Sequence, residues 1–194
     1  MKKIIFSIVV IAGVLTCFNV FEKSFGNTTK LKKEVAIGDK HQGGIVAYIL
    51  QAGDAGYDEK EQHGLIAAPA DQVEEIQWYN GTYIEMNAKA SGLGAGKANT
   101  DTIVSRQGEG SYAAKICSDL VIGEYSDWYL PSKDELNKLY LNKAKIGGFV
   151  NGGTYWSSSI DVKIFYAWRQ GFFSGSQASS DKKALLAVRA VRWF

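Results

Sequence analysis

The first 26 residues indicate the compartment in which the rest of the chain folds. Lys2 and Lys3 precede an uncharged run over residues 4–21, and a basic start followed by an apolar core is typical of a secretory signal. Three interpretations stay open: a signal peptide within residues 1–26 that is cleaved, an uncleaved membrane anchor over residues 4–21, and lipidation at Cys17. Each places the remaining chain outside the cytoplasm, in the cell envelope or at the cell surface.

An exported domain of this kind has to fold without internal disulfide bonds. The sequence holds two cysteines, and Cys17 belongs to the leader, so Cys117 has no partner in the body. Small secreted domains often depend on disulfides, but about 160 residues suffice to bury a hydrophobic core. We therefore predict a polar tether over residues 27–37 and one domain over residues 38–194, with Cys117 buried as a small apolar residue.

The order of the expected elements predicts an α+β fold. Strand-like segments lie at both ends of the body and helix-like segments lie between them, which differs from the regular alternation of an α/β protein. Glycine-rich loops are expected over residues 51–63 and 80–100, and a loop as long as the second is uncommon unless it is functional or well packed. The expected strands cover residues 43–50, 64–68, 154–157, 165–172 and 185–194.

Two segments between the strands have helical patterns. Ser132 and Glu135 have the spacing of a capping box, an apolar stripe follows them, and the pair Gly147 and Gly148 predicts the end of that helix. A second helix is expected within residues 99–122, where apolar residues recur on one face before Gly123.

The charge of the body argues against a nucleic-acid-binding protein. Basic and acidic side chains balance outside the first 26 residues, whereas nucleic-acid-binding domains usually carry a basic excess. The two histidines, His41 and His63, lack the spacing of zinc ligands, so no metal centre is expected. A weak alternative is calcium in an acidic loop. That loop contains Asp54, Asp58, Glu59 and Glu61.

Several motifs of the body occur in the order of a known domain family. They lie at residues 63–68, 76–81, 98–100, 112–115, 127–136, 155–159, 167–168 and 188–192. The chain resembles the Lcl C-terminal domain family, named for the end domain of a bacterial collagen-like adhesin. The resemblance implies a C-type-lectin-like fold of the formylglycine-generating-enzyme type. In that fold two helices flank a small, irregular antiparallel sheet, and the N- and C-terminal strands pair.

The resemblance implies binding rather than catalysis. Enzymes of this fold use a cysteine pair or an iron site with several histidines, and the body supplies neither. Family members are mostly exported binding domains, and some recognise sulfated glycans. We predict a ligand-binding protein without catalytic residues or a cofactor, whose ligand is a protein or a glycan. The alternatives are a glycan-binding adhesin of fixed specificity and, more distantly, an enzyme of the formylglycine-generating type.

The last 40 residues resemble the variable segment of receptors that retroelements diversify. In such receptors, adenine changes convert Asn codons into many others around a fixed frame of residues. In this sequence, the residues that resemble the fixed frame are Trp168, Gln170, Phe172, Gly175, Gln177 and Lys182. The residues that fill the gaps within residues 160–187 are reachable from Asn codons, except Lys163 and Lys183.

This segment supplies the predicted binding site. Exposed aromatic and aliphatic residues close together, with an arginine, are typical of a binding surface. We therefore predict a variable surface patch over residues 160–187. Its ligand-binding residues are Asp161, Ile164, Phe165, Tyr166, Arg169, Phe173, Ser174 and Ser176. Four residues are expected to support it from below: Trp128, Trp156, Trp168 and Phe172.

Overall fold

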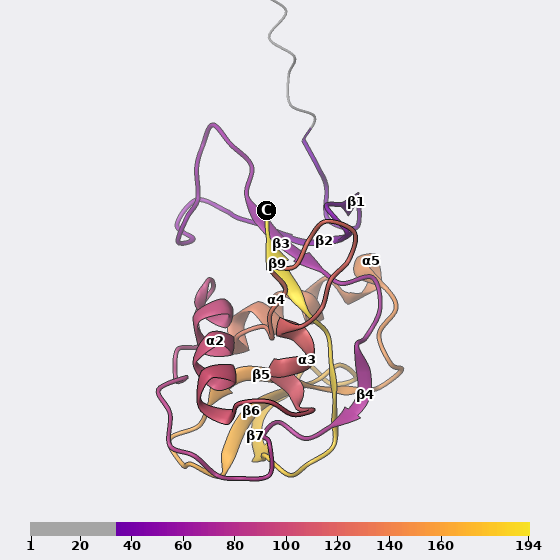
Figure 1. Ribbon diagram of the computed structural model, residues 1–194. Coiled ribbons are helices and arrows are strands. Elements are labelled where there is room, and N and C mark those ends of the chain that lie inside the picture. Colours follow the sequence, from indigo (N-terminus) through magenta and orange to yellow (C-terminus); the bar gives the residue numbers. More distant parts are fainter. Residues whose placement is uncertain (1–33) are drawn as a thin grey trace, which may run out of the picture. The chain divides into compact units, whose positions relative to one another are not determined.

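Residues 34–194 are described by the computed structural model shown in Figure 1. The predictions for the leader and for Cys17 lie outside these residues. Val35 exchanges two hydrogen bonds with the Gln62 side chain, so the folded part begins before residue 38. Within residues 34–194, no helix is long and apolar enough to cross a bilayer.

A four-stranded antiparallel sheet contains the first strands and the last one. Its order is β1 (Lys40–His41), β2 (Gly44–Ile49), β3 (Gly64–Ala67) and β9 (Val191–Trp193). The apolar runs predicted as strands at residues 43–50 and 64–68 form β2 and β3, and every residue of β3 is buried. The C-terminal strand therefore pairs with β3 and not with the first strand.

A second sheet of five strands carries most of the C-terminal half. Its order is β4 (Val73–Ile76), β8 (Leu186–Val188), β5 (Thr154–Ile160), β6 (Tyr166–Gly171) and β7 (Gln177–Asp181). Its pairs are antiparallel except that β5 and β8 run parallel. The fold is thus mixed α and β, but the single antiparallel sheet expected from the resemblance is wrong, because the described residues form two sheets.

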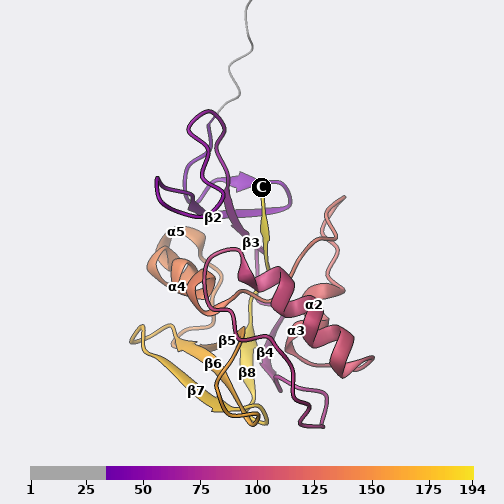
Figure 2. The same ribbon diagram turned by 90° about the vertical axis from the view of Figure 1, so that its left-hand side faces the viewer.

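In the sequence, the described helices follow β4 and precede β5. Figure 2 shows α4 and α5 on one side of the strands and α2 and α3 on the other. They are α2 (Ala95–Gln107), α3 (Ala113–Ser118), α4 (Lys133–Leu141) and α5 (Lys143–Ile146). The single helix expected within residues 99–122 is wrong. Gly108 and Gly110 take positive φ angles of 71° and 153°, a conformation that interrupts a helix, so the segment forms α2 and α3.

The capping box of α4 is confirmed, and it also holds the start of α2. Ser132 Oγ accepts a hydrogen bond from the Glu135 backbone N–H, while the Glu135 carboxylate accepts one from the Ser132 N–H. The same carboxylate accepts from the Gly94 N–H at 2.9 Å, directly before α2. A Cβ at Gly96 would lie 2.2 Å from Glu135 Oε2. This close approach requires glycine and joins the two helices at their N-termini.

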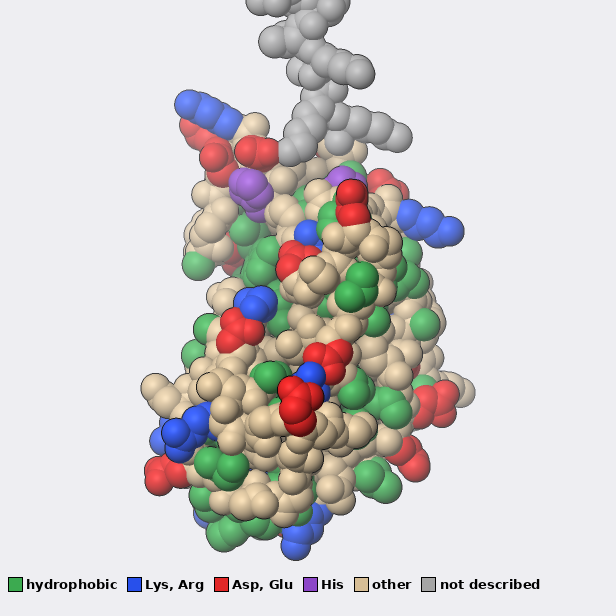
Figure 3. Space-filling view, in the orientation of Figure 1, with side chains coloured by type: hydrophobic (Ala, Val, Ile, Leu, Met, Phe, Trp, Pro, Cys, Tyr) green, Lys and Arg blue, Asp and Glu red, His purple; other side chains and the backbone are tan. Residues whose placement is uncertain are grey.

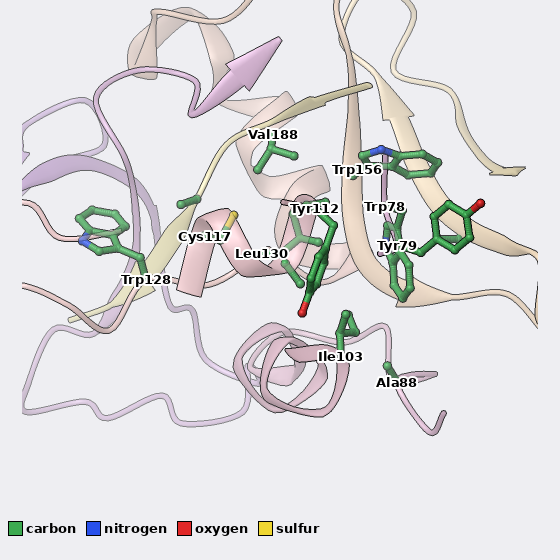
Figure 4. Packing of buried hydrophobic residues seen from close by; sticks show 14 of the residues in the cluster. Trp78, Tyr79, Ala88, Ile103, Tyr112, Cys117, Trp128, Leu130, Trp156 and Val188 are labelled. Atoms are coloured by element: carbon green, nitrogen blue, oxygen red, sulfur yellow. The ribbon is translucent and has the colours of Figure 1, made fainter. Parts of the chain in front are cut away.

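Two groups of buried apolar residues form the core. The first contains Trp78, Trp128 and Trp156 together with side chains from α2 and α3 (Figure 4). Cys117 is buried within it, and burial raises the pKa of its thiol, which confirms its expected structural role. The second group packs α4 against Tyr155 and neighbouring rings.

One buried guanidinium connects the second sheet to the first. Arg189 follows β8, and its Nε donates to Asp71 Oδ1 at 2.6 Å. Its other nitrogens donate to the carbonyls of Ala68, after β3, and of Gly148, before β5. Asp71 Oδ2 also accepts from the Tyr155 hydroxyl at 2.6 Å. Because the Arg189 side chain is fully buried and that of Asp71 nearly so, each charge depends on the other.

We expect Asp71→Asn to lower the free energy of unfolding by about 3–5 kcal/mol, because Arg189 would remain as a buried charge without compensation. Urea unfolding measures this loss. Asp101→Asn is the matched control, since it breaks an exposed pair with Lys97, and it should cost less than about 1 kcal/mol. Equal losses in the two variants would contradict the role assigned to Arg189.

Candidate functional site

The predicted ligand-binding residues lie along one hairpin rather than in one patch. β6 and β7 pair over their whole length, and the predicted residues occupy both ends of this hairpin. β6 has six residues and is about 20 Å long, so the predicted residues are spread along the hairpin and do not form one compact cluster. The loop before β6 holds Asp161, Ile164 and Phe165, β6 itself holds Tyr166 and Arg169, and the turn after β6 holds Phe173, Ser174 and Ser176.

The turn between β6 and β7 offers one isolated apolar side chain. Phe173 is 86% exposed, whereas the adjacent Phe172 is buried and packs edge-on against Tyr140 of α4. Gly175 has a φ of 76°, and a Cβ there would lie 2.6 Å from the Tyr140 ring. The turn is therefore packed closely on α4, while Phe173 stays exposed.

The loop before β6 carries a larger exposed apolar surface. Val162 is 83% exposed and Phe165 is 48% exposed. The Phe165 ring meets the Tyr83 ring in a T-shaped contact with 4.9 Å between centroids, and the Tyr83 hydroxyl donates to Asp181 Oδ1 at 2.8 Å. We call Val162, Phe165 and Tyr83 the loop-end patch. Figure 3 shows hydrophobic side chains gathered at this lower end of the domain.

A second segment, distant in sequence, completes this end of the hairpin. The chain between β4 and α2 runs past the loop before β6 (Figure 1). Ile160 N–H donates to the Ala88 carbonyl, and Ser159 Oγ donates to the Ala90 carbonyl. No site residue was predicted in this segment from the sequence. The one available indication was the unusual length of the loop expected over residues 80–100.

The two segments enclose a small cavity, and the first of them also lines a wider hollow beside α2. A cavity of about 30 Å³ has apolar walls from Ile84 and Met86 on one side and Ile160 and Ile164 on the other, and Lys182 also lines it. A wider hollow of about 430 Å³ extends from there to α2. Glu85, Met86 and Lys89 line both. The hollow beside α2 and the small cavity beside the loop-end patch thus have three lining residues in common.

Lys182 is the least compensated charge at this site. Its side chain is 1% exposed, and its Nζ has no hydrogen-bond partner within residues 34–194. Nζ lies 4.4 Å from the centroid of the Trp78 ring, so the ring face attracts the ammonium. Burial nevertheless dominates and lowers the pKa of Lys182 from 10.5 to about 8, because a charged amine loses its hydration there.

One face of the hairpin is fixed to α4 by frame residues. Lys133 Nζ lies 3.6 Å from the Trp168 ring centroid. Gln170 Nε2 donates to Asn137 Oδ1 at 2.8 Å, and Gln177 Nε2 donates to the Lys133 carbonyl at 3.0 Å. Trp168, Gln170 and Gln177 alternate with the other strand residues and share this face. Trp168 therefore helps to hold the hairpin against α4, and its predicted support of a binding patch stays a prediction.

The other face contains Arg169 and its cross-strand partner Trp156. Arg169 pairs across the strands with Trp156, which is buried and donates its indole N–H to the Ile76 carbonyl. Arg169 Nε donates to Ser180 Oγ at 2.8 Å. Trp156 thus lies beside Arg169 on the same face of the sheet, and its support of a binding patch stays a prediction. Trp128 does not lie there, because Figure 4 places it across the core from Trp156.

A model of the Lcl C-terminal domain family matches residues 68–192. The chain belongs to this family. The matched part of the Lcl C-terminal domain begins just after β3 and includes Asp71, the loop-end patch and Lys182. No curated protein sequence matches the chain.

The acidic loop of this Lcl C-terminal domain uses one carboxylate for its own structure. Asp54 Oδ2 accepts from the Tyr48 hydroxyl at 2.6 Å and from the Gln51 N–H. The hydrogen bond from Tyr48 lowers the pKa of Asp54, while burial and Asp54 raise the pKa of Tyr48 to about 12. In the described part of the chain, no three His, Cys, Asp or Glu side chains are grouped as metal ligands. Calcium binding stays a prediction.

We expect Lys182→Met to stabilise the Lcl C-terminal domain. Between pH 8 and 10.5 the folded state binds fewer protons than the unfolded state, so stability rises with pH in this window and the full cost of the charge is present below it. The free energy of unfolding of the variant should be higher by on the order of 2 kcal/mol at neutral pH. It should no longer increase between pH 8 and 10.5.

Urea unfolding as a function of pH measures both effects. Lys183→Met is the control, because it removes the adjacent, exposed lysine, and it should leave the rise with pH in place. An unchanged pH profile in Lys182→Met would show that the ammonium is not desolvated in the folded protein.

Proposed function

We propose that this chain is an exported or membrane-tethered bacterial protein that binds a ligand through the loop-end patch on a C-type-lectin-like scaffold. The observation that carries the proposal is the contact between Phe165 and Tyr83. It leaves 48% of Phe165 exposed while holding the ring in place. A ring that is ordered before binding loses little entropy when the ligand arrives, and aromatic residues dominate the energetics of interfaces.

The hairpin also supports the proposal of a variable surface over residues 160–187. Trp168, Gln170 and Gln177 contact α4 through their own side chains. The loop residues Val162 and Phe165 are exposed, so their identity matters less for packing. Variation at such positions changes the ligand that is recognised while the frame residues keep the hairpin in place.

A protein ligand fits the loop-end patch better than a glycan. Rings that stack on sugars need an open face, but Trp156 is fully buried and Lys133 covers Trp168. An exposed apolar patch that contains Val162 and Phe165 is typical of a surface that binds another protein. Binding rather than catalysis is proposed because the buried Glu135 caps two helices and Asp127 pairs with Arg192.

We expect the double variant Val162→Ser and Phe165→Ser to reduce affinity for the ligand at least about tenfold, because it removes the apolar anchors. Arrays of proteins and of glycans, probed with the full chain, identify the ligand and compare the variants. Val121→Ser with Leu141→Ser is the control, since both side chains are exposed elsewhere. Unchanged binding by the first variant, or a loss of several kcal/mol in stability, would refute this site.

We also expect a near-copy of the codons for residues 160–187 beside the gene, differing from it only at adenines, together with a reverse transcriptase. Sequencing of the flanking DNA tests this directly. If no such copy is present, the surface has a fixed specificity and the variable-surface part of the proposal fails.

A further inference from the structure

Two exposed lysines border the loop-end patch without a carboxylate partner. Lys163 lies in the loop that carries Val162 and Phe165, and Lys183 lies in the turn after β7. The ion pairs of the described residues are formed by other side chains. Within residues 34–194, neither lysine therefore has an ion-pair partner.

Aromatic rings lie close to both ammonium groups. Lys183 Nζ lies 5.5 Å from the centroid of the Tyr83 ring, and Tyr83 belongs to the loop-end patch. Lys163 Nζ lies 5.9 Å from the centroid of the Tyr166 ring, at the start of β6. Ring faces attract cations at such distances. Figure 3 shows Lys or Arg side chains beside the hydrophobic ones at this end of the domain, so the positive charges lie at the rim of an apolar surface.

The acidic side chains of the same two segments are used within the domain. Asp161 Oδ1 accepts a hydrogen bond from the Val162 N–H at 2.6 Å. Asp181 Oδ1 accepts from the Tyr83 hydroxyl at 2.8 Å and from the Lys183 backbone N–H at 2.9 Å. Both aspartates are half-buried, whereas both lysines are exposed. An approaching partner therefore meets the ammonium groups first, and their N–H donors are free to bind it.

The other charged residues beside the patch do not alter this arrangement. Glu85 and Lys89 line the small cavity next to Val162, and their charges are opposite. Lys182 lines the cavity too, but its Nζ is buried. Because Glu85 and Lys89 offset each other, Lys163 and Lys183 determine which sign of charge a partner meets at the rim.

We propose that the loop-end patch recognises a protein segment in which an aromatic or aliphatic anchor is flanked by acidic side chains that pair with Lys163 and Lys183. The inference rests on the proposed function and specifies the chemistry of the partner at the same site. Protein interfaces combine an apolar centre with a polar rim. Val162 and Phe165 form the centre here, and the two lysines form part of the rim.

The two parts of this surface have different effects on binding. The apolar centre supplies most of the affinity. Charges at a rim steer an oppositely charged partner and exclude a like-charged one, and salt screens them because they are exposed. Lys163 and Lys183 therefore select among partners whose apolar anchors fit equally well.

The test is a selection from a phage-displayed library of random short peptides on the immobilised full chain. Peptides that need the loop-end patch are those lost from the Val162→Ser and Phe165→Ser variant. We expect these peptides to contain an excess of Asp and Glu beside an aromatic or aliphatic residue. Reversing both charges, by Lys163→Glu with Lys183→Glu, should weaken their binding at least about tenfold.

The control reverses two lysines of other segments. Lys60→Glu with Lys145→Glu changes the net charge by the same amount at exposed residues, and it should keep the affinity within about twofold because these charges are screened from the patch. Lys163→Gln with Lys183→Gln removes the charges without adding new ones, and its loss of affinity should be intermediate. Urea unfolding checks that each variant is folded.

Four outcomes would overturn the inference. Peptides that need the patch could lack an excess of Asp and Glu. The control could weaken binding as much as the reversal of Lys163 and Lys183. Poly-glutamate, which has no apolar anchor, could compete as well as the selected peptides. Vesicles of phosphatidylcholine with phosphatidylglycerol could bind through both lysines while no peptide does, in which case the partner is a membrane.

The proposed function and this inference fail in different ways. If no selected peptide is lost from the Val162→Ser and Phe165→Ser variant, the loop-end patch is not the binding site, and the inference fails with it. If peptides are lost from that variant but bind the charge-reversed variant as well as the unaltered chain, the patch is confirmed and the acidic partner alone is refuted.

Discussion

The buried guanidinium of Arg189 determines how the two sheets meet. The chain leaves the second sheet at β8 and enters the first sheet at β9 within a few residues, and Arg189 lies at this crossing. Its bonds to Asp71, to the Ala68 carbonyl and to the Gly148 carbonyl join its own segment to the chain after β3 and to the chain before β5. The hydroxyl of Tyr155, at the start of β5, bonds to the same aspartate. The register of β5 therefore depends on this charge pair, and the hairpin of β6 and β7 depends on β5.

The candidate site combines a hairpin that is held against α4 with a buried lysine whose ammonium has no hydrogen-bond acceptor in the described part of the chain. The contacts of Trp168, Gln170 and Gln177 with α4 fix the hairpin, while the segment before α2 brings Tyr83 and the cavity walls to its end. Lys182 costs stability in this setting because its charge is buried without an acceptor. Departures from good packing and pairing are concentrated at functional sites, which is why we regard this lysine as part of the site.

Local patterns in the sequence predicted local structure well. The capping box of Ser132 and the buried runs of β2 and β3 depend on neighbouring residues alone, and they were predicted within a residue or two. The strands β4 and β7 were missed because their sequences, VEEI and QASSD, contain polar residues in succession and no apolar run. The division of the predicted patch into two ends, and the contribution of Tyr83, depend on tertiary contacts between distant segments, which no periodicity in one sequence reveals.

The alternation along β6 and β7 limits how this segment can change. Along each strand, residues whose side chains contact α4 alternate with residues that face away from it. An inserted or deleted residue would turn the side chains beyond it to the opposite face of the sheet. Gln170 and Gln177 would then lose Asn137 and the Lys133 carbonyl, and the hairpin would lose its attachment. Substitutions leave this order intact. The two strands can therefore accept substitutions far more readily than insertions or deletions, so this segment can diversify only at a constant length.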